Sequence, residues 1–379
     1  MHILEIPSFF PPFGGAFCLE QAKALRSIGH EVRVLSLTQI GMSATPRQYF
    51  SMPCNTRYIC MDSIEIIQRF QRDIPRMTQR NQQCYCRTLR QMYHDYVRRY
   101  GKPDVIHAHC CQWAGVAAWM ISKESGIPFF ITEHLSSMIF KANYGAEWTR
   151  NVWAKELLTQ TYQAANCVIP VSKELVDDLA PFFGRDYRWQ EVSNIIDTDF
   201  FHFRQRQALD GRKFRFCCLA VSHGYNFHLK GYDVLAEAFR DIEGAELHIA
   251  GRATDSDRMR SAFGSNPSVI IHGNLGKDGV RDLLYHCDAL VLASRSEVQP
   301  LVLLEAMATG IPVVSTEVTP QSERISNACF IAKIGHANSL REQMIKCMSI
   351  APSQAFSDAV TKIASPEKIA RKIEKVFLS

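Results

Sequence analysis

The chain has 379 residues, 46% of them hydrophobic and 21% charged, with a formal net charge of +5. This length and composition are typical of a globular protein with two domains, and so mild a charge does not favour nucleic acid as a partner. The sequence has no apolar run of about 18 residues and no basic leader followed by an apolar stretch, so we expect neither a membrane span nor a signal peptide.

The first half alternates strand patterns with helix patterns. Ile3–Ile6 is predicted as a strand, Gly14-Gly15 opens a helix that stops at Gly29, and Glu31–Leu37 is the next strand. Later strands are expected at 104–107, 128–132 and 167–171, and helices at 115–125 and 173–179. Such alternation predicts a parallel sheet covered by helices on both faces.

Residues 65–102 differ from the rest of this half, because they hold nine Arg or Lys residues and three acids. Apolar residues recur at helical spacing, with Pro75 placed to kink or divide the helix; they are Ile67, Phe70, Ile74, Met77, Leu89, Met92 and Tyr96. One interpretation is a solvated basic face on a core-facing helix. The other is a surface for anionic lipid or a phosphate-bearing acceptor.

The second half repeats the alternation. Strands are expected at 214–221, 245–250, 269–272, 289–293 and 312–315, and helices at 232–239, 280–286 and 301–308. We therefore predict two Rossmann-like domains, at 1–200 and 206–365. The final helix, 366–379, has an apolar face and is expected to pack back on the first domain.

Glu297 and Glu305 stand eight residues apart around Pro300. A helix that begins near Pro300 presents its first N–H groups close to Glu297, and a helix N-terminus binds phosphate well. Carboxylates accept hydrogen bonds from sugar hydroxyls. One short segment thus offers groups that suit a nucleotide-sugar.

Lys230-Gly231 follows the strand predicted at 214–221, where Rossmann-type domains bind ligands. A lysine there can neutralise a diphosphate, although an ordinary surface lysine is the alternative. Gly14-Gly15 lets the backbone approach a ligand at the start of a helix, or it forms a plain tight turn. The sequence there is not G-x-G-x-x-G, which argues against a dinucleotide dehydrogenase.

Histidines gather at the ends of two predicted strands in the first half: His107 and His109 at one, and His134, directly after Glu133, at the other. A lone histidine is more often structural than catalytic. Several at the carboxyl ends of strands in one domain favour a ligand-binding edge.

The sequence does not favour a metal or a cofactor. Asp197-x-Asp199 and Asp255-x-Asp257 imitate a metal motif, but turn and helix-cap roles explain aspartates at such places, so we expect no metal. The 13 cysteines contain no C-x-x-C and are interpreted as reduced core thiols of a cytoplasmic protein. No G-x-S-x-G, P-loop or H-E-x-x-H motif occurs.

Together these segments resemble the retaining glycosyltransferases of family 4, whose GT-B fold has two Rossmann-like domains with parallel sheets facing a central cleft. The resemblance covers nearly the whole chain in order, and its most specific part is the donor-site signature from Ser294 to Val314. The other matching segments are 12–16, 29–32, 104–109, 132–134, 171–173, 194–200 and Lys230-Gly231.

The resemblance implies a role for each candidate residue. Lys230 would bind the diphosphate, Glu297 the transferred sugar and Glu305 the ribose. The helix-start residues that would assist Glu297 are Gln299, Pro300 and Leu301. On the other domain, His134 would lie beside the anomeric centre and Gly15 near the diphosphate, with Gly14, His109 and Glu133 on the acceptor side.

The chain departs from the family pattern at two places. His223 or Gly224 stands where many relatives carry a second phosphate-binding cation, an arginine, so His223 is a candidate donor ligand and Arg252 another. Val298-Gln299 replaces the glycine and aromatic residue that usually follow the first glutamate, which alters the sugar pocket.

The predicted function is transfer of a hexose-type sugar from a nucleoside-diphosphate sugar to a saccharide or lipid-linked saccharide, in cell-envelope polysaccharide synthesis. The enzyme would need no metal or cofactor. It would act in the cytoplasm, with contact to the inner face of the membrane through residues 65–102. The alternatives are a nucleotide-sugar epimerase or hydrolase of the same fold, and a non-catalytic sugar-nucleotide-binding subunit.

Overall fold

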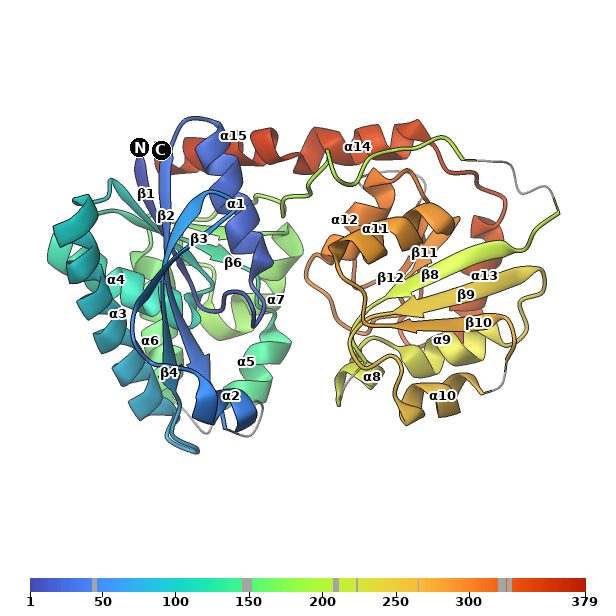
Figure 1. Cartoon of the computed structure of the whole chain (residues 1–379), viewed down its shortest axis with the longest axis horizontal. Coiled ribbons are helices and arrows are strands. Elements are labelled where there is room, and N and C mark those ends of the chain that lie inside the picture. The colour runs from blue at the N-terminus through green and yellow to red at the C-terminus, as the bar shows by residue number, and fades with distance from the viewer. Residues whose placement is uncertain are drawn as a thin grey trace. The chain divides into compact units, whose positions relative to one another are not determined.

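The computed structural model describes residues 1–42, 46–144, 152–206, 211–222, 224–264, 266–319, 325 and 329–379. The chain divides into two compact units (Figure 1). Unit 1 comprises Met1–Ile195 together with Pro366–Ser379, and unit 2 comprises Ile196–Ser365. The point of division, Ile195 to Ile196, lies a few residues before residue 200, the predicted end of the first domain.

Unit 1 is built on a seven-stranded sheet of order β3-β4-β2-β1-β5-β6-β7. The strands are β1 (His2–Pro7), β2 (Glu31–Ile40), β3 (Arg57–Met61), β4 (Ile64–Arg72), β5 (Val105–His109), β6 (Phe129–Glu133) and β7 (Cys167–Pro170). All neighbours pair in parallel except β3, which forms an antiparallel pair with β4. The carboxyl ends of β1, β5 and β6 therefore meet at one edge of the sheet.

Helices connect these strands. They are α1 (Ala16–Ser27), α2 (Pro46–Ser51), α3 (Thr78–Tyr100), the short π-helical η1 (Cys111–Gly115), α4 (Val116–Ser125), α5 (Ser137–Tyr144), α6 (Val152–Ala164) and α7 (Lys173–Phe183). In α3, the residues Leu89, Met92 and Tyr96 are buried, as their helical spacing predicted.

The helical interpretation of residues 65–77 is wrong. Ile67 and Phe70 belong to β4, which pairs in parallel with β2, and Pro75 lies between β4 and α3. The strand has apolar residues buried on both faces of the sheet, so its pattern does not show the simple alternation of a half-exposed strand. The basic residues of 65–102 are consequently divided between β4, α3 and the segments on either side of α3 instead of lining one helix.

The last helix, α15 (Pro366–Phe377), belongs to unit 1 although unit 2 precedes it in the sequence. Ile369, Ile373 and Val376 are fully buried against the core of this unit. A Glu374 carboxylate oxygen lies 3.0 Å from His30 Nε2, and Phe377 packs against His107 and Phe130. The end of the chain thus lies directly beside the histidines of β5.

Unit 2 has a six-stranded sheet, entirely parallel, of order β10-β9-β8-β11-β12-β13. The strands are β8 (Phe214–Leu219), β9 (Ala245–Ala250), β10 (Val269–Gly273), β11 (Ala289–Val291), β12 (Val313–Thr316) and β13 (Cys329–Ala332). The helices are α8 (Asn226–Leu229), α9 (Tyr232–Phe239), α10 (Asp257–Phe263), α11 (Lys277–His286), α12 (Leu301–Ala308), α13 (Ala337–Cys347) and α14 (Gln354–Ala364).

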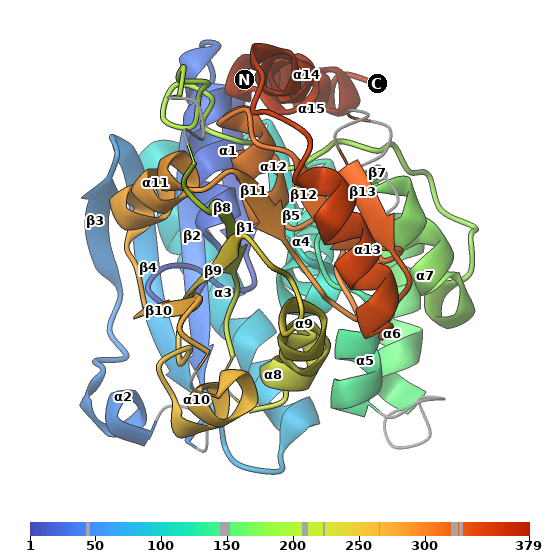
Figure 2. The ribbon, with the colours of Figure 1, turned by 90° about the vertical axis from the view of Figure 1, so that its right-hand side faces the viewer.

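The two faces of this sheet bury separate cores because successive side chains of a strand point to opposite sides. Phe216 and Cys218 of β8 pack in the cluster that includes α9 and α13, which lie side by side in Figure 2. Cys217 and Leu219 pack in the cluster that includes α11, α12 and α14. No helix in the described part of the chain has the length and apolarity that a bilayer crossing requires.

Candidate active site

Lys230 and Glu297 lie together in unit 2. The Lys230 Nζ donates to Glu297 Oε1 at 2.7 Å, and the Ser294 hydroxyl donates to the same oxygen at 2.7 Å. The lysine and glutamate side chains are 19% and 11% exposed, so both remain within reach of a ligand. The structure therefore brings together two predicted site residues that are 67 positions apart.

Gly231 makes this contact possible. Its φ is +67°, and a Cβ at this position would lie 1.9 Å from the Ala293 carbonyl oxygen. Only glycine tolerates both the left-handed backbone and so close an approach. The Arg295 N–H also donates to the Leu229 carbonyl at 2.8 Å, so the turn that carries Lys230 is held against the chain that follows β11.

Helix α12 begins directly after this segment. Pro300 has an extended backbone and precedes Leu301, the first helical residue, so the first amides of the helix have no acceptor within it. Pro300 has no N–H, which leaves Gln299 and Leu301 as the amide donors among the three residues predicted here. Glu305, partly buried, stands one turn further along the same helix. The Lys230 cation, the two carboxylates and the start of α12 together suit a sugar that is linked to a diphosphate.

The structure does not supply the missing phosphate-binding arginine at an obvious place. His223 lies outside the described residues, and the Arg252 side chain is exposed. Arg295 is adjacent in the chain, but its guanidinium binds the His228 carbonyl and forms two bonds of 2.8 Å with Asp233. In the described part of unit 2, Lys230 is thus the best-placed of the predicted cations.

In unit 1, Glu133 does not fit the acceptor-side role that was expected. The side chain is fully buried and accepts four hydrogen bonds, from the amides of Cys111, His134 and Leu135 and from the Tyr162 hydroxyl at 2.6 Å. Burial raises the pKa of this carboxyl, against the effect of those donors. Glu133 therefore ties the end of β6 to η1 and α6, which is a structural role.

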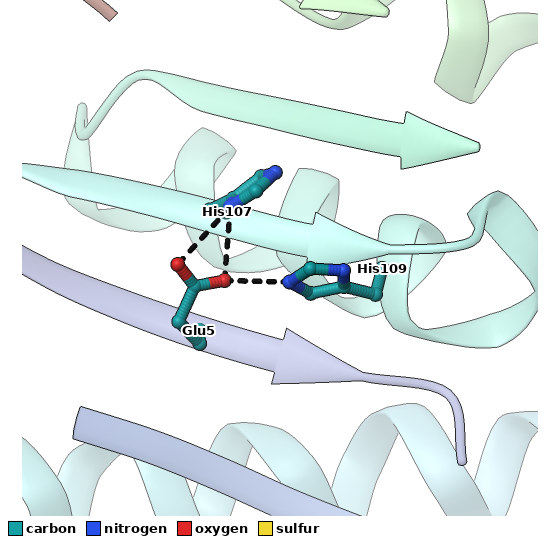
Figure 3. A group of neighbouring side chains, drawn as sticks. All are labelled: Glu5, His107 and His109. Carbon is teal, nitrogen blue, oxygen red and sulfur yellow. Dashed lines mark hydrogen bonds and ion pairs between the residues drawn. The ribbon is translucent and has the colours of Figure 1, made fainter. Parts of the chain in front are cut away.

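His109 is also fully buried, and it belongs to a network that the sequence did not reveal. Glu5 of β1 lies opposite His107 of β5, and Figure 3 shows both His107 and His109 directed at its carboxylate. His107 Nδ1 lies 2.9 Å and His109 Nε2 2.8 Å from Glu5 Oε2. Burial alone would raise the pKa of the Glu5 carboxyl, but the two rings lower it to about 2.

His134 adjoins this network. Its ring stacks on Phe17 with centroids 3.8 Å apart and lies nearly parallel to His109 at 5.8 Å. The Nε2 atom is buried and has no hydrogen-bond partner among the described residues. Burial, together with the neighbouring His109 and His107, keeps the pKa of His134 well below its usual value, so the ring is neutral at pH 7.

The diglycine turn brings Phe17 to this place. Gly15 has φ +74°, and a Cβ there would lie 2.0 Å from the Phe9 carbonyl oxygen, so the turn requires glycine. Gly14 packs beside the Phe9 ring, which contacts Phe17 edge to face. Two predicted residues of unit 1, His109 and His134, thus contact Phe17, while Gly14 and Gly15 shape the turn that precedes its helix.

Two residues of this group were missed. Phe17 is not among the residues predicted for the site. Glu5 had a readable signal, since a lone acid inside the apolar strand Ile3–Ile6 must be buried with a partner.

Some of these side chains are of the kind that binds metal. The ligand atoms of Glu5, His107 and His109 all lie within 4.8 Å of one another. They are engaged in hydrogen bonds with one another, and the absence of a metal requirement stays a prediction. Asp197, by contrast, accepts from the Phe200 amide and pairs with Lys277, as a turn residue would.

Comparison with known proteins assigns the family. Residues 14–200 match the family described as Glycosyltransferase Family 4, and residues 215–349 match the one described as Glycosyl transferases group 1. The chain belongs to the family 4, or group 1, glycosyltransferases. It is 25% identical over 344 residues to a Bacillus subtilis glycosyltransferase, TuaC, named for teichuronic acid biosynthesis, with 84% of this chain and 81% of TuaC covered.

This glycosyltransferase is also similar to a mannosylfructose-phosphate synthase of Agrobacterium fabrum, at 26% identity over 54% of this chain and 51% of that protein. Among solved structures, sucrose-phosphate synthase from Thermosynechococcus elongatus aligns over 100% of this chain and 98% of its own, with a TM-score of 0.78 and 16% identity. HepE of Anabaena, in complex with UDP, aligns over 100% of both chains with a TM-score of 0.71 and 17% identity. These likenesses confirm the GT-B fold.

Proposed function

We propose that this glycosyltransferase transfers a hexose-type sugar, with retention of configuration, from a nucleoside-diphosphate sugar to a saccharide or lipid-linked saccharide. The observation that carries the proposal is the joining of Lys230, Glu297 and the start of α12 in unit 2. Negative charge grows on the diphosphate as the sugar leaves, so a cation already in place lowers the barrier. Lys230 supplies that cation, and no metal is needed.

Each of these site residues binds a different part of the donor. Lys230 has three N–H donors and can keep its bond to Glu297 while it binds phosphate. Glu297, oriented by Ser294, accepts from hydroxyls of the transferred sugar, and Glu305 accepts from the ribose. The amides of Gln299 and Leu301 assist. For His134, a neutral ring, we propose a contact with the transferred sugar near its anomeric carbon.

In the transfer itself, the bond between the anomeric carbon and the phosphate oxygen breaks while the acceptor oxygen bonds to that carbon on the same face. The proton of the acceptor hydroxyl passes to the departing phosphate oxygen. This course needs no covalent enzyme nucleophile.

The comparisons support the choice of substrates. HepE was solved with UDP and with UDP-glucose, which supports a nucleotide-sugar donor here. TuaC is named for teichuronic acid biosynthesis, which supports a role for this chain in cell-envelope polysaccharide synthesis.

Thermal unfolding with a panel of nucleoside diphosphates and their sugars tests the donor. A ligand at about 100 times its Kd stabilises the folded protein by about 2.7 kcal/mol. The true donor should raise the Tm of the native enzyme and raise it less in Lys230→Ala. The donor is then offered with a panel of saccharide acceptors. Full donor turnover without an acceptor would indicate an epimerase or hydrolase, and binding without chemistry a non-catalytic subunit.

We further propose that unit 1 contacts anionic lipid through a membrane-facing patch made of Phe50, Ile74, Arg76, Met77 and Arg80. Phe50, Ile74 and Met77 are 73%, 41% and 42% exposed, and both arginines are exposed. Insertable apolar side chains flanked by arginines are typical of peripheral membrane binding.

Neighbouring contacts hold this patch together. The Arg72 guanidinium binds the carbonyls of Tyr49, Phe50 and Met52, and the Asp73 amide donates to Ile40. Other cations of 65–102 are engaged elsewhere, with Arg90 bound to Glu124 and Arg98 to Asp95. Sedimentation with anionic vesicles at low salt tests the patch, and Phe50→Ser combined with Arg80→Ser should weaken binding. Equal binding to neutral vesicles would contradict an electrostatic contribution.

A further inference from the structure

Glu5 is a carboxylate in a place where the fold itself has no need of one. It is fully buried in β1 between Leu4 and Ile6, which are also fully buried. Removing a charge from water is costly unless partners compensate for the lost solvation. The strand would be satisfied by an apolar residue, so the partners of Glu5 indicate its purpose.

Those partners are the two histidines of β5. Because His107 and His109 are two residues apart in a strand, their rings lie on the same face of the sheet as Glu5. An ionised carboxylate only accepts hydrogen bonds, so both nitrogens that face it, His107 Nδ1 and His109 Nε2, carry hydrogens. His107 Nε2 then bonds Thr132 Oγ1 at 2.7 Å.

The consequence for His109 is specific. With its hydrogen on Nε2, the neutral ring has its lone pair on Nδ1, which is buried and has no partner among the described residues. Burial lowers the pKa of His109, which favours this neutral form. The ring is thus held in one tautomer and one orientation by Glu5.

Ring stacking links the orientation of His109 to that of His134. The His109 and His134 rings are 5.8 Å apart and inclined by only 16°, and Phe17 contacts both, at 5.8 Å and 3.8 Å. His134 itself has no side-chain hydrogen bond at Nε2 within the described part of unit 1. Ring contacts, not hydrogen bonds, therefore set where that nitrogen points.

We propose that Glu5 is a positioning residue for sugar transfer: it orients His109, and through the stacked rings it orients His134 toward the substrate. The inference rests on the role proposed for His134 and goes beyond it, since Glu5 does not touch the reacting atoms. Supports of this kind behind a functional side chain typically change activity by about 10- to 100-fold when they are removed.

Glu5→Gln is the test. Glutamine keeps the size of the side chain, but it is neutral, and its NH₂ group replaces one of the two carboxylate oxygens. Its hydrogen bonds to the two rings are therefore weaker, and no ionised acceptor fixes the tautomer of His109. We expect kcat to fall about 10-fold, while KM for the donor stays within about two-fold because the proposed donor-binding groups are in unit 2.

Thr132→Val is the matched control. Thr132 is as buried as Glu5 and bonds the other arm of the network, at His107 Nε2. The kcat of the Thr132→Val variant should stay within about two-fold of the native value. If both variants lose the same activity, or if Glu5→Gln keeps the native kcat, the proposal is overturned and Glu5 is only part of the core.

Histidine ring NMR on ¹⁵N-labelled protein gives a readout that needs no turnover, with signals assigned from His109→Gln and His134→Gln. The native protein should show His109 protonated at Nε2, and Glu5→Gln should shift the ring signals of both His109 and His134. Unmoved His134 signals would overturn the proposal, as would a metal ion bound one to one in the native protein and lost in Glu5→Gln. If the native enzyme transfers no sugar, the proposed function fails by itself, and the NMR result still decides the coupling of the rings.

Discussion

The two units present different chemistry at the corresponding edges of two similar sheets. In unit 1 the polar groups beyond β1, β5 and β6 are buried and bonded to one another, as with Glu133, which accepts four hydrogen bonds. In unit 2, Lys230 and Glu297 are partly exposed at the start of a helix. This difference indicates that the groups of unit 2 suit a charged ligand, whereas unit 1 holds neutral histidine rings in fixed positions.

The largest expected effect follows from the charge in unit 2. Lys230→Ala removes the cation that we propose stabilises the leaving diphosphate, and we expect kcat to fall about 100-fold or more, as on loss of one electrostatic donor elsewhere. Glu305→Ala should lose activity to a similar degree. Steady-state kinetics with the donor found by thermal shift measures both.

Lys277→Ala is the control for this prediction. Lys277 pairs with Asp197 at 3.1 Å and is 48% exposed, so its loss should leave kcat unchanged. Near-native turnover of Lys230→Ala would remove the comparison between the units, because Lys230 would then not supply a charge that the reaction needs.

The diglycine turn of unit 1 gives the next effect. Gly15→Ala places a Cβ 2.0 Å from the Phe9 carbonyl oxygen, whereas Gly29→Ala meets nothing within 4 Å, although both backbones have positive φ. Both variants should lose about 1 kcal/mol for the backbone, and Gly15→Ala about 2 kcal/mol more for the displaced turn. Urea unfolding measures the difference, and equal losses would show that the turn gives way easily.

Two buried tyrosines compare the hydrogen bonds of the units directly. Tyr162 donates to the Glu133 carboxylate and Tyr232 to the Ala220 carbonyl, each at 2.6 Å. Bonds to charged groups are stronger than bonds to neutral ones, so Tyr162→Phe should cost about 2–3 kcal/mol and Tyr232→Phe about 1 kcal/mol. A reversed order, measured by urea unfolding, would contradict the interpretation of Glu133 as the anchor of β6.

The smallest effect concerns acid stability of unit 2. His248 lies 3.0 Å from His272, and burial together with His272 and His286 lowers the pKa of His248 to about 4, against a small opposing effect of Glu246. In the unfolded chain the pKa of His248 is near 6.5, so the unfolded state binds the proton more readily. The stability that the neutral ring contributes is therefore fully present above pH 6.5 and is lost as the pH falls toward 4.

Since His272 and His286 are exposed and solvent screens them, we expect this loss to be about 1–2 kcal/mol. The Tm of native protein and His248→Gln, recorded from pH 7.5 to pH 4.5, measures it. The variant should lose less stability on acidification, and parallel curves would remove the prediction.

Much of the fold could be predicted because parallel strands and amphipathic helices leave strong local patterns. The strands β1, β5 and β6 and helices such as α9 and α12 lie close to where the sequence placed them. The pattern failed at β4, where Ile67 and Phe70 are spaced as on a helix but lie in a strand buried on both faces. Local periodicity cannot report burial that a neighbouring strand creates.

The candidate site shows the same division. Lys230, Glu297, Gly15 and His134 were readable because each stands in a short motif with a chemical reason. For Glu5, a lone acid in an apolar strand signals a buried carboxylate, but its partners could not be read, because they lie 102 and 104 residues away and only strand pairing brings them together.

Most element types, the two-domain organisation of a family 4 glycosyltransferase and a set of candidate residues for a diphosphate sugar could be inferred from the amino-acid sequence alone, because these depend on short-range pattern and side-chain chemistry. Which of these polar groups a ligand can reach depends on the tertiary structure. In the folded chain Glu133 accepts hydrogen bonds from four donors, Lys230 bonds to Glu297, and Glu5 bonds to His109. The physical reason is that burial and hydrogen-bond partners come from segments distant in the chain, and they decide whether a carboxylate supports the fold or meets a ligand.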